Sequence, residues 1–167
     1  MRIIGPPSAD IDTVRANIPT TAHARFRASM FPHLWEMAWR YGIDPVGVVA
    51  QSFKETGGGN FGRAVTPLHF NTAGIKRVDI AGLADDDPNA HARFASWEVG
   101  AMAQCQHLGA YAGMPVDDLI VDPRFWLVKV TPATWCENFE DLAGRWAPSP
   151  TYGTELVAIA RRLQGRA

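Results

Sequence analysis

One carboxylate, Glu55, has a position that could support acid–base chemistry. It falls in the last turn of a helix predicted between Asp44, a suitable N-cap, and Gly57, a suitable left-handed end. The negative end of the helix dipole disfavours an anion there, and cover by Phe61 and Phe70 would raise the pKa of the carboxyl group further. A carboxyl group that stays protonated near neutral pH can donate a proton to a leaving oxygen, as in glycoside cleavage. The alternative is a solvated surface glutamate, which is common beside a helix end.

The elements that must position Glu55 follow from apolar spacing and helix-end signals. These predict helices at 10–18, 32–41, 44–57, 96–112, 131–144 and 152–163. Residues 63–95 lack a long helical period, and the segments IKRVDI and HARFAS could pair there as a small hairpin. We therefore expect a single, mainly α domain over residues 1–167, with an extended lead-in at 1–9 and a small irregular β-hairpin lobe at 63–95.

Composition and missing motifs exclude several functional classes. The formal net charge is −1 and the pI about 6.5, so no basic stripe for nucleic acid is expected. There is no apolar run long enough to span a membrane, and the first residues have no signal-peptide pattern. Cys105 and Cys136 are expected to be free thiols. Because zinc, phosphate-loop and nucleophile-elbow motifs are missing, we expect no metal and no cofactor.

The run AQSFKETGGGNFGRAVTPLHFNTAGIK resembles the core of family 73 of the glycoside hydrolases, the peptidoglycan β-N-acetylglucosaminidases found in many phage endolysins. The matching residues are Ala50-Gln51, Glu55-Thr56-Gly57, Asn71 and Ala73-Gly74-Ile75. The segments IIGPPS, AMAQCQHLGAYAG and LAGRWAPSPTYG are similar to further family motifs, in the same order. The resemblance implies a lysozyme-like α fold with a glycan cleft between two lobes, and Glu55 as the catalytic acid.

Other residues singled out by the resemblance or by their position each have a structural alternative. Tyr152 matches a tyrosine near the family's cleft, or simply belongs to the apolar stripe of the last helix. Asn71 would fix a substrate amide or the loop, where an Asx-turn would account for it. His69 could contact sugar or be a satisfied loop histidine. Phe61 and Trp97 are candidate sugar platforms, and core packing explains Trp97 equally well.

The family also implies a second carboxylate in the small lobe, shortly before the strand matched by Phe94. The lobe has no glutamate, and it offers Asp79 and the triplet at 85–87. Because alternate strand residues face opposite sides, we expect Val78 and Ile80 to pack inward and Asp79 to face the cleft. The triplet is typical of a solvated turn. If none of these acts, the N-acetyl group of the sugar would assist instead.

These expectations combine into one function. We expect a peptidoglycan hydrolase of the endo-β-N-acetylglucosaminidase type that cuts the bacterial glycan strand, as a phage endolysin or its catalytic domain. It would be made in the cytoplasm, reach the wall through a phage holin, and act as a monomer or within a larger modular lysin. The alternatives are a muramidase or lytic transglycosylase on the same fold, and a non-catalytic wall-binding or virion structural module.

Overall fold

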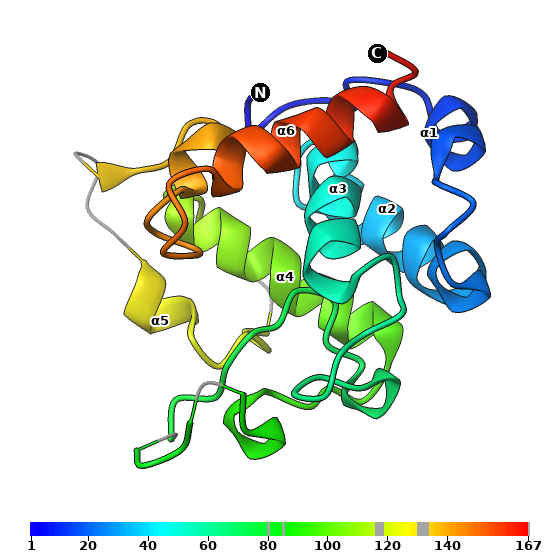
Figure 1. Cartoon of the computed structure of the whole chain (residues 1–167). Coiled ribbons are helices and arrows are strands. Elements are labelled where there is room, and N and C mark those ends of the chain that lie inside the picture. The colour runs from blue at the N-terminus through cyan, green and yellow to red at the C-terminus, as the bar shows by residue number, and fades with distance from the viewer. Residues whose placement is uncertain (80, 85, 116–118, 130–133, 167) are drawn as a thin grey trace.

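Helices dominate the structure, as the sequence predicts. The computed structural model describes residues 1–167 except 80, 85, 116–118, 130–133 and 167. The α-helices are α1 (Ile11–Asn17), α2 (Phe31–Arg40), α3 (Pro45–Thr56), α4 (Trp97–Tyr111), α5 (Phe125–Val128) and α6 (Tyr152–Leu163). Shorter turns are the π-helix η1 (Phe26–Met30) and the 3₁₀ helices η2 (Pro67–His69), η3 (Pro88–Ala90) and η5 (Phe139–Leu142). Figure 1 shows α6 lying across α3, with the segment 63–95 below them as a smaller lobe.

The ends of α3 follow the signals in its sequence. Asp44 accepts a hydrogen bond from the backbone at 3.0 Å, which caps the start of the helix. Gly57 ends it with a φ of 57°, a left-handed conformation that favours glycine. Asp10 and Ser96, the first residues of the predicted helices at 10–18 and 96–112, likewise accept hydrogen bonds at the starts of α1 and α4. These ends place Glu55 in the last turn of α3, as predicted.

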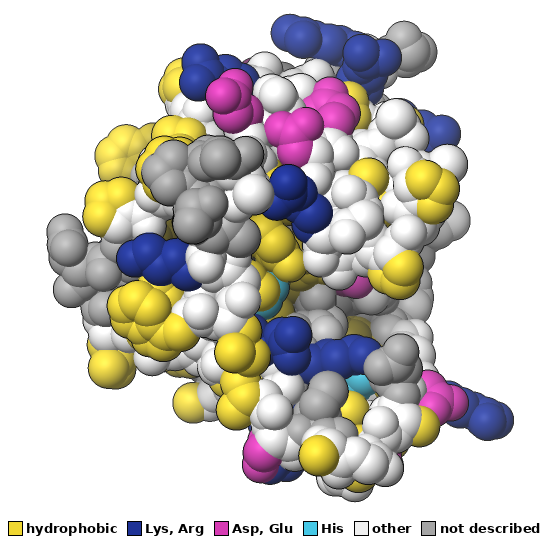
Figure 2. All heavy atoms as spheres, turned by 90° about the vertical axis from the view of Figure 1, so that its left-hand side faces the viewer, with side chains coloured by type: hydrophobic (Ala, Val, Ile, Leu, Met, Phe, Trp, Pro, Cys, Tyr) yellow, Lys and Arg dark blue, Asp and Glu magenta, His cyan; other side chains and the backbone are white. Residues whose placement is uncertain are grey.

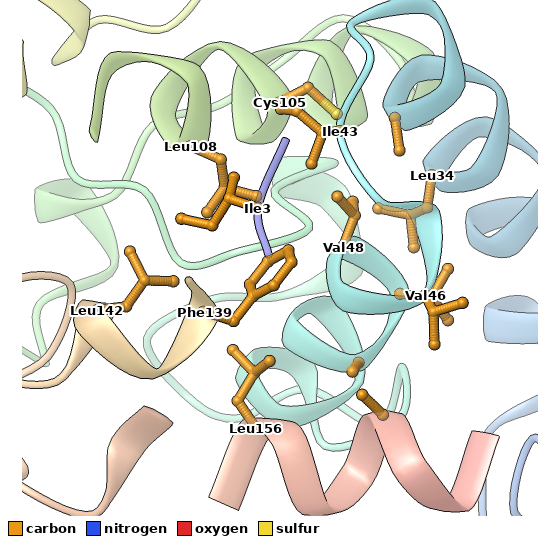
Figure 3. Close-up of a cluster of buried hydrophobic side chains, with 14 of the residues drawn as sticks. Ile3, Leu34, Ile43, Val46, Val48, Cys105, Leu108, Phe139, Leu142 and Leu156 are labelled. Carbon is orange, nitrogen blue, oxygen red and sulfur yellow. The ribbon is translucent and has the colours of Figure 1, made fainter. Parts of the chain in front are cut away.

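The main hydrophobic core lies among α2, α3, α4 and α6, with α3 packed against both α2 and α6. The extended lead-in at 1–9 contributes to it, because Ile3 is fully buried and isolated bridges flank it on both sides. Figure 3 shows Ile3 between Leu108 of α4 and Phe139 of η5. The lead-in is therefore a structural part of the domain that carries α3.

Both cysteines are buried and neither forms a disulfide. Cys105 packs in the core from α4, and Cys136 joins the same core from the segment before η5. Burial raises the pKa of both thiols. A buried thiol with a raised pKa is a poor nucleophile, so neither cysteine is a candidate catalytic group.

The hairpin predicted within 63–95 is not shown by the structure. Among the described residues of this lobe, the only ladder contact is an isolated bridge between Lys76 and His91. Pro88 opens the 3₁₀ helix η3, and Asp87 caps it by accepting a hydrogen bond from the backbone at 2.8 Å, within the loop that was predicted between the two segments. Val78 is 55% exposed, which makes its predicted inward packing wrong, and Ile80 lies outside the described residues.

The helix predicted at 131–144 is also wrong over most of its described part. Residues 130–133 lie outside the described residues, and the rest contains only the short η5. The chain is extended at Asn138, which caps η5 and forms a bridge to the N-terminal segment. Phe139 and Leu142 are buried in the core, whereas Trp135 is 42% exposed. The bridge between Asn138 and Arg2 therefore takes the place of a continuous helix here.

Gly100 of α4 lets the helix touch the lobe, and this contact can be tested. A Cβ atom there would lie 1.8 Å from the carbonyl oxygen of Phe70, so Gly100→Ala must push the chain away from α4. We expect a loss of unfolding free energy of about 1–3 kcal/mol in urea titrations. The matched control is Gly109→Ala in the same helix, whose added Cβ has its nearest contact at 3.6 Å. It should gain about 0.5–1 kcal/mol, and equal effects of the two changes would contradict the close approach.

Candidate active site

The carboxyl group of Glu55 lies at the junction of α3 and the glycine loop. The three glycines after the helix all have positive φ, from 57° to 82°, so the chain turns back sharply from the helix end. The lobe approaches from the other side. An added Cβ at Gly74 would lie 3.6 Å from Glu55 Oε2, which places the backbone of Gly74 against that oxygen. The side chain is therefore largely enclosed between α3 and the lobe.

A directional chain of buried hydrogen bonds ends on Glu55. Thr72 Oγ1 donates to Gln104 Oε1 at 2.8 Å, and Gln104 Nε2 donates to Gln51 Oε1 at 2.9 Å. Gln51 Nε2 then donates to Tyr152 Oη at 3.1 Å, and Tyr152 Oη donates to Glu55 Oε1 at 2.6 Å. The four donors are all buried. We call this series the Thr72–Glu55 chain.

The electrostatics favour a protonated Glu55. Burial raises the pKa of its carboxyl group, opposed by the hydrogen bond from Tyr152, the charge of Lys54 and a hydrogen bond from the Trp146 indole. Burial and the adjacent Glu55 raise the pKa of the Tyr152 hydroxyl, so that hydroxyl stays a neutral donor. Since Tyr152 occupies Oε1, the oxygen available to carry a transferable proton is Oε2, on the side of Gly74.

Tyr152 combines the two roles that the sequence left open. Its ring belongs to the main core, as the apolar stripe of α6 predicts, and its hydroxyl binds Glu55. Gln51 and Glu55 stand on one face of α3, as their spacing predicts, because both bind the same hydroxyl. The part of Tyr152 in catalysis stays a prediction.

Asn71 and His69 have the structural alternatives that the sequence offered. The Asn71 amide nitrogen donates to the carbonyls of Ile75 at 2.8 Å and Ala92 at 3.0 Å, and its oxygen accepts from the Ile75 backbone at 2.9 Å. His69 is 1% exposed, with one ring nitrogen bonded to the Thr66 backbone and the other to the Pro88 carbonyl. Both side chains therefore hold the lobe in shape. Their contact with a sugar remains an untested prediction.

Three aromatic rings form a cluster beside the glycine loop. Phe61 stacks on Trp97 with ring centroids 5.9 Å apart, and Phe70 meets Trp97 edge-on at 5.1 Å. Phe61 and Phe70 both have positive φ, 59° and 49°, which is costly for a residue with a Cβ and must be held by surrounding contacts. All three rings are partly buried. Their use as a sugar platform stays a prediction.

Asp79 lies in the exposed part of the lobe. Its carboxylate pairs with the Arg77 guanidinium, which donates from Nε to Oδ1 at 2.8 Å and holds the pKa of Asp79 below its usual value. Of the alternative triplet, Asp85 lies outside the described residues, Asp86 is exposed, and Asp87 caps η3. Asp79 as the second catalytic carboxylate stays a prediction.

A cavity of about 250 Å³ that the sequence did not reveal adjoins Glu55. Two of its lining residues also lie beside the carboxyl group: Gly74 against Oε2, and Trp146, whose indole lowers the pKa of Glu55. The opposite wall comes from α4, α5 and residue 145. Figure 2 shows the face that carries α5, where Lys and Arg side chains surround a hollow with a histidine side chain inside it. The cavity gives a ligand access to the neighbourhood of Glu55.

Two further properties of the described residues bear on function. They contain no group of three or more His, Cys, Asp or Glu side chains that could hold a metal ion. No helix among them is both long and apolar enough to cross a bilayer.

Comparisons with known proteins identify the fold. No protein-family model and no curated protein sequence matches the chain. Among solved structures, the chain is similar to the catalytic domain of the autolysin Auto from Listeria monocytogenes, with a TM-score of 0.53 and 15% sequence identity. The match covers 95% of this chain and 98% of the autolysin domain. The protein therefore has the fold of an autolysin catalytic domain, while membership of glycoside hydrolase family 73 stays a prediction.

The hydrogen bond from Tyr152 to Glu55 makes a testable contribution to stability. Burial raises the pKa of Glu55 in the folded protein above its ordinary value of 4.5. The stability linked to its proton is therefore complete below that ordinary value and is lost as the pH rises through the folded pKa. The Tyr152 hydroxyl lowers the pKa of Glu55 in the folded protein. Tyr152→Phe should therefore raise this pKa further and enlarge the loss of stability at higher pH. Destabilisation by about 1.5–3 kcal/mol is expected near pH 7 and less near pH 4, measured by thermal melting.

The matched control is Tyr41→Phe, whose hydroxyl accepts a hydrogen bond from Gln106 at 3.0 Å. Its effect on stability should not change over this pH range. A carbon NMR titration of the Glu55 carboxyl group should show the higher pKa directly in Tyr152→Phe. An equal loss of stability at both pH values, with an unchanged Glu55 pKa, would contradict the interpretation.

Proposed function

We propose that this protein is a peptidoglycan hydrolase that cleaves the glycan strand, with Glu55 as the general acid. The observation that carries the proposal is the environment of Glu55: burial raises its pKa, a neutral tyrosine holds Oε1, and Oε2 is left on the side of an open cavity. This is the state in which a carboxyl group can protonate a glycosidic oxygen. The shared fold with an autolysin catalytic domain supports the wall glycan as substrate.

In the proposed reaction, Glu55 transfers its proton from Oε2 to the bridging oxygen as the bond from that oxygen to the anomeric carbon breaks. The sugar then develops oxocarbenium character, and water adds to the anomeric carbon. Tyr152 keeps its proton and stabilises the Glu55 anion that forms, because a hydrogen bond to a carboxylate is stronger than one to a carboxylic acid. Either Asp79 or the acetamido group of the sugar assists on the opposite face.

The finer assignment is an endo-β-N-acetylglucosaminidase of the phage endolysin type. Its support is the resemblance of the Glu55 segment and the RWAPSPTYG segment to family 73 motifs. The holin route to the wall and action as a monomer or within a modular lysin belong to the same proposal. Mass spectrometry of digested peptidoglycan tests the bond that is cut. A reducing-end N-acetylglucosamine supports it, whereas reducing or anhydro muramic acid ends would favour a muramidase or a lytic transglycosylase.

Glu55→Gln should abolish glycan cleavage while the fold persists. The amide keeps the shape and still accepts the Tyr152 hydrogen bond, but it has no proton of suitable acidity to donate. Loss of a general acid costs about 10²–10⁴ in rate, measured as release of reducing ends from purified peptidoglycan. Glu36→Gln, an exposed change on α2, is the control and should retain wild-type activity.

Two results would overturn the assignment of Glu55. One is activity of Glu55→Gln close to that of Glu36→Gln, which would place the acid elsewhere. The other is full biological effect of Glu55→Gln without any cleavage by the wild type, which is what a wall-binding or virion structural module predicts. Near-identical melting curves for the two variants at acidic pH exclude unfolding as the cause of a loss.

Asp79→Asn tests the second carboxylate. An inverting enzyme holds its two carboxyl groups ~6.5–9.5 Å apart with a water between them, so loss of Asp79 should lower turnover about 10-fold or more if it is the base. Because Asp79 is exposed, stability should change little. Asp86→Asn, also exposed in the lobe, is the matched control. Equal loss from both variants would indicate the turn, and no loss from either would assign the second step to the substrate's acetamido group.

A further inference from the structure

The cavity beside Glu55 is lined by cations. Lys76, Arg124 and Arg145 all contribute to its wall, and among the described residues that line it none is acidic. Cations around a concave surface raise the local concentration of anions and favour their binding. A cavity that served only to admit neutral sugar would have no need of these charges.

Backbone carbonyls hold the side chains of Arg124 and Arg145 in place but do not neutralise their charges. Arg124 Nη1 donates to the carbonyl of Arg77 at 3.4 Å, and Arg145 Nη1 donates to the carbonyl of Thr134 at 2.5 Å. Neither guanidinium forms an ion pair with any carboxylate in the described part of the chain. Each keeps further N–H groups for a ligand, and a guanidinium fork matches the two oxygens of a carboxylate.

His107 supplies an independent sign that the cavity binds a ligand. Its ring lines the cavity and is only 6% exposed, and Nδ1 donates to Asp122 Oδ2 at 2.8 Å. The other Asp122 oxygen accepts from the Arg124 backbone at 3.0 Å, so one buried carboxylate orients both the imidazole and the start of α5. His107 Nε2 has no hydrogen-bond partner among the described residues. An imidazole held in one orientation on a cavity wall can offer its second ring nitrogen to an outside ligand.

We propose that this cavity is a subsite for a carboxylate carried by the muramic acid next to the bond that is cut. The inference rests on the proposed function and deepens it. A wall glycan differs from chitin in the lactyl ether on alternate sugars, which ends in a free carboxylate or continues into a peptide that bears carboxylates. At about 250 Å³ the cavity is smaller than pockets for whole drug-sized ligands, which are about 300–1,000 Å³, so it suits a substituent of the glycan.

The position of the subsite explains how it would act. Gly74 and Trp146 touch both the cavity and Glu55, so a substituent held there fixes the sugar relative to the acid. Holding a substrate in register with a catalytic group accelerates the reaction more than general affinity does. A chito-oligosaccharide has the same backbone without the anion and would lose this alignment.

Three substrates and two arginine variants test the subsite. The substrates are chito-oligosaccharides, wall glycan stripped of peptides, and wall glycan with its peptides. For Arg124→Gln and Arg145→Gln, the ratio of kcat/KM on carboxylated glycan to kcat/KM on chito-oligosaccharide should fall by about 10-fold or more. Arg161→Gln, an exposed change on α6 with the same loss of charge, should leave that ratio at the wild-type value.

The pattern of loss identifies the source of the carboxylate. A fall only on stripped glycan assigns the lactyl carboxylate, which is free there, and a fall only on glycan with peptides assigns a carboxylate of the peptide. A fall on both wall glycans shows that the subsite takes either carboxylate. An unchanged ratio in both variants overturns the subsite while leaving the proposed function in place. If the wild type cleaves none of the substrates, the proposed function fails, and calorimetry then decides the subsite alone. If Glu55→Gln binds carboxylated glycan more tightly than chito-oligosaccharide, and the arginine changes remove this preference, the subsite is supported. If Glu55→Gln shows no such preference, the subsite is overturned.

Discussion

The hydrogen bond from Tyr152 to Glu55 is the interaction on which the arrangement of this domain depends. This bond is the last link of the Thr72–Glu55 chain, whose residues come from separate elements. Tyr152 lies in α6, Glu55 and Gln51 in α3, Gln104 in α4, and Thr72 in the lobe. Each internal group both donates and accepts, so removing any link leaves a buried polar group unpaired at a cost of about 1–3 kcal/mol. The packing of three helices and the lobe is therefore coupled to the state of one carboxyl group.

The lobe can reach this chain because the backbone accepts unusual conformations where it meets α4. Phe70 is left-handed, and its carbonyl lies against Gly100, a position where any side chain would collide with it. Thr72, two residues further on, donates hydrogen bonds to the Gly100 carbonyl and to Gln104 Oε1. Asn71 compensates by satisfying the turn with its own side chain. The strained backbone at Phe70 thus directs the chain so that the next turn, at Gly74, lies against Glu55 Oε2.

Most of the helical scaffold and its central carboxylate could be predicted from the sequence, because caps, terminal glycines and apolar spacing are local signals. Of the hairpin predicted from IKRVDI and HARFAS, the described residues keep only one antiparallel bridge, between Lys76 and His91, and no strand is shown. The helix at 131–144 was wrong because pairing of Asn138 with the N-terminal segment is a long-range contact. In the sequence, nothing distinguishes Gln104 and His107 from the other residues of the predicted helix at 96–112. Their roles depend on partners far away in the chain, which no local pattern reveals.

The two kinds of charge in the site serve different purposes, and the structure keeps them apart. Lys54 adjoins Glu55 in sequence and lowers its pKa, but Lys54 also pairs with Glu155 at 2.6 Å, which weakens that influence and leaves burial dominant. Arg124 and Arg145, by contrast, form no ion pair with any carboxylate in the described part of the chain, so both can bind an anionic group of a ligand. In the proposed enzyme, burial therefore sets the acidity of Glu55, while the arginines act on the substrate and hold its anion in register with that acid.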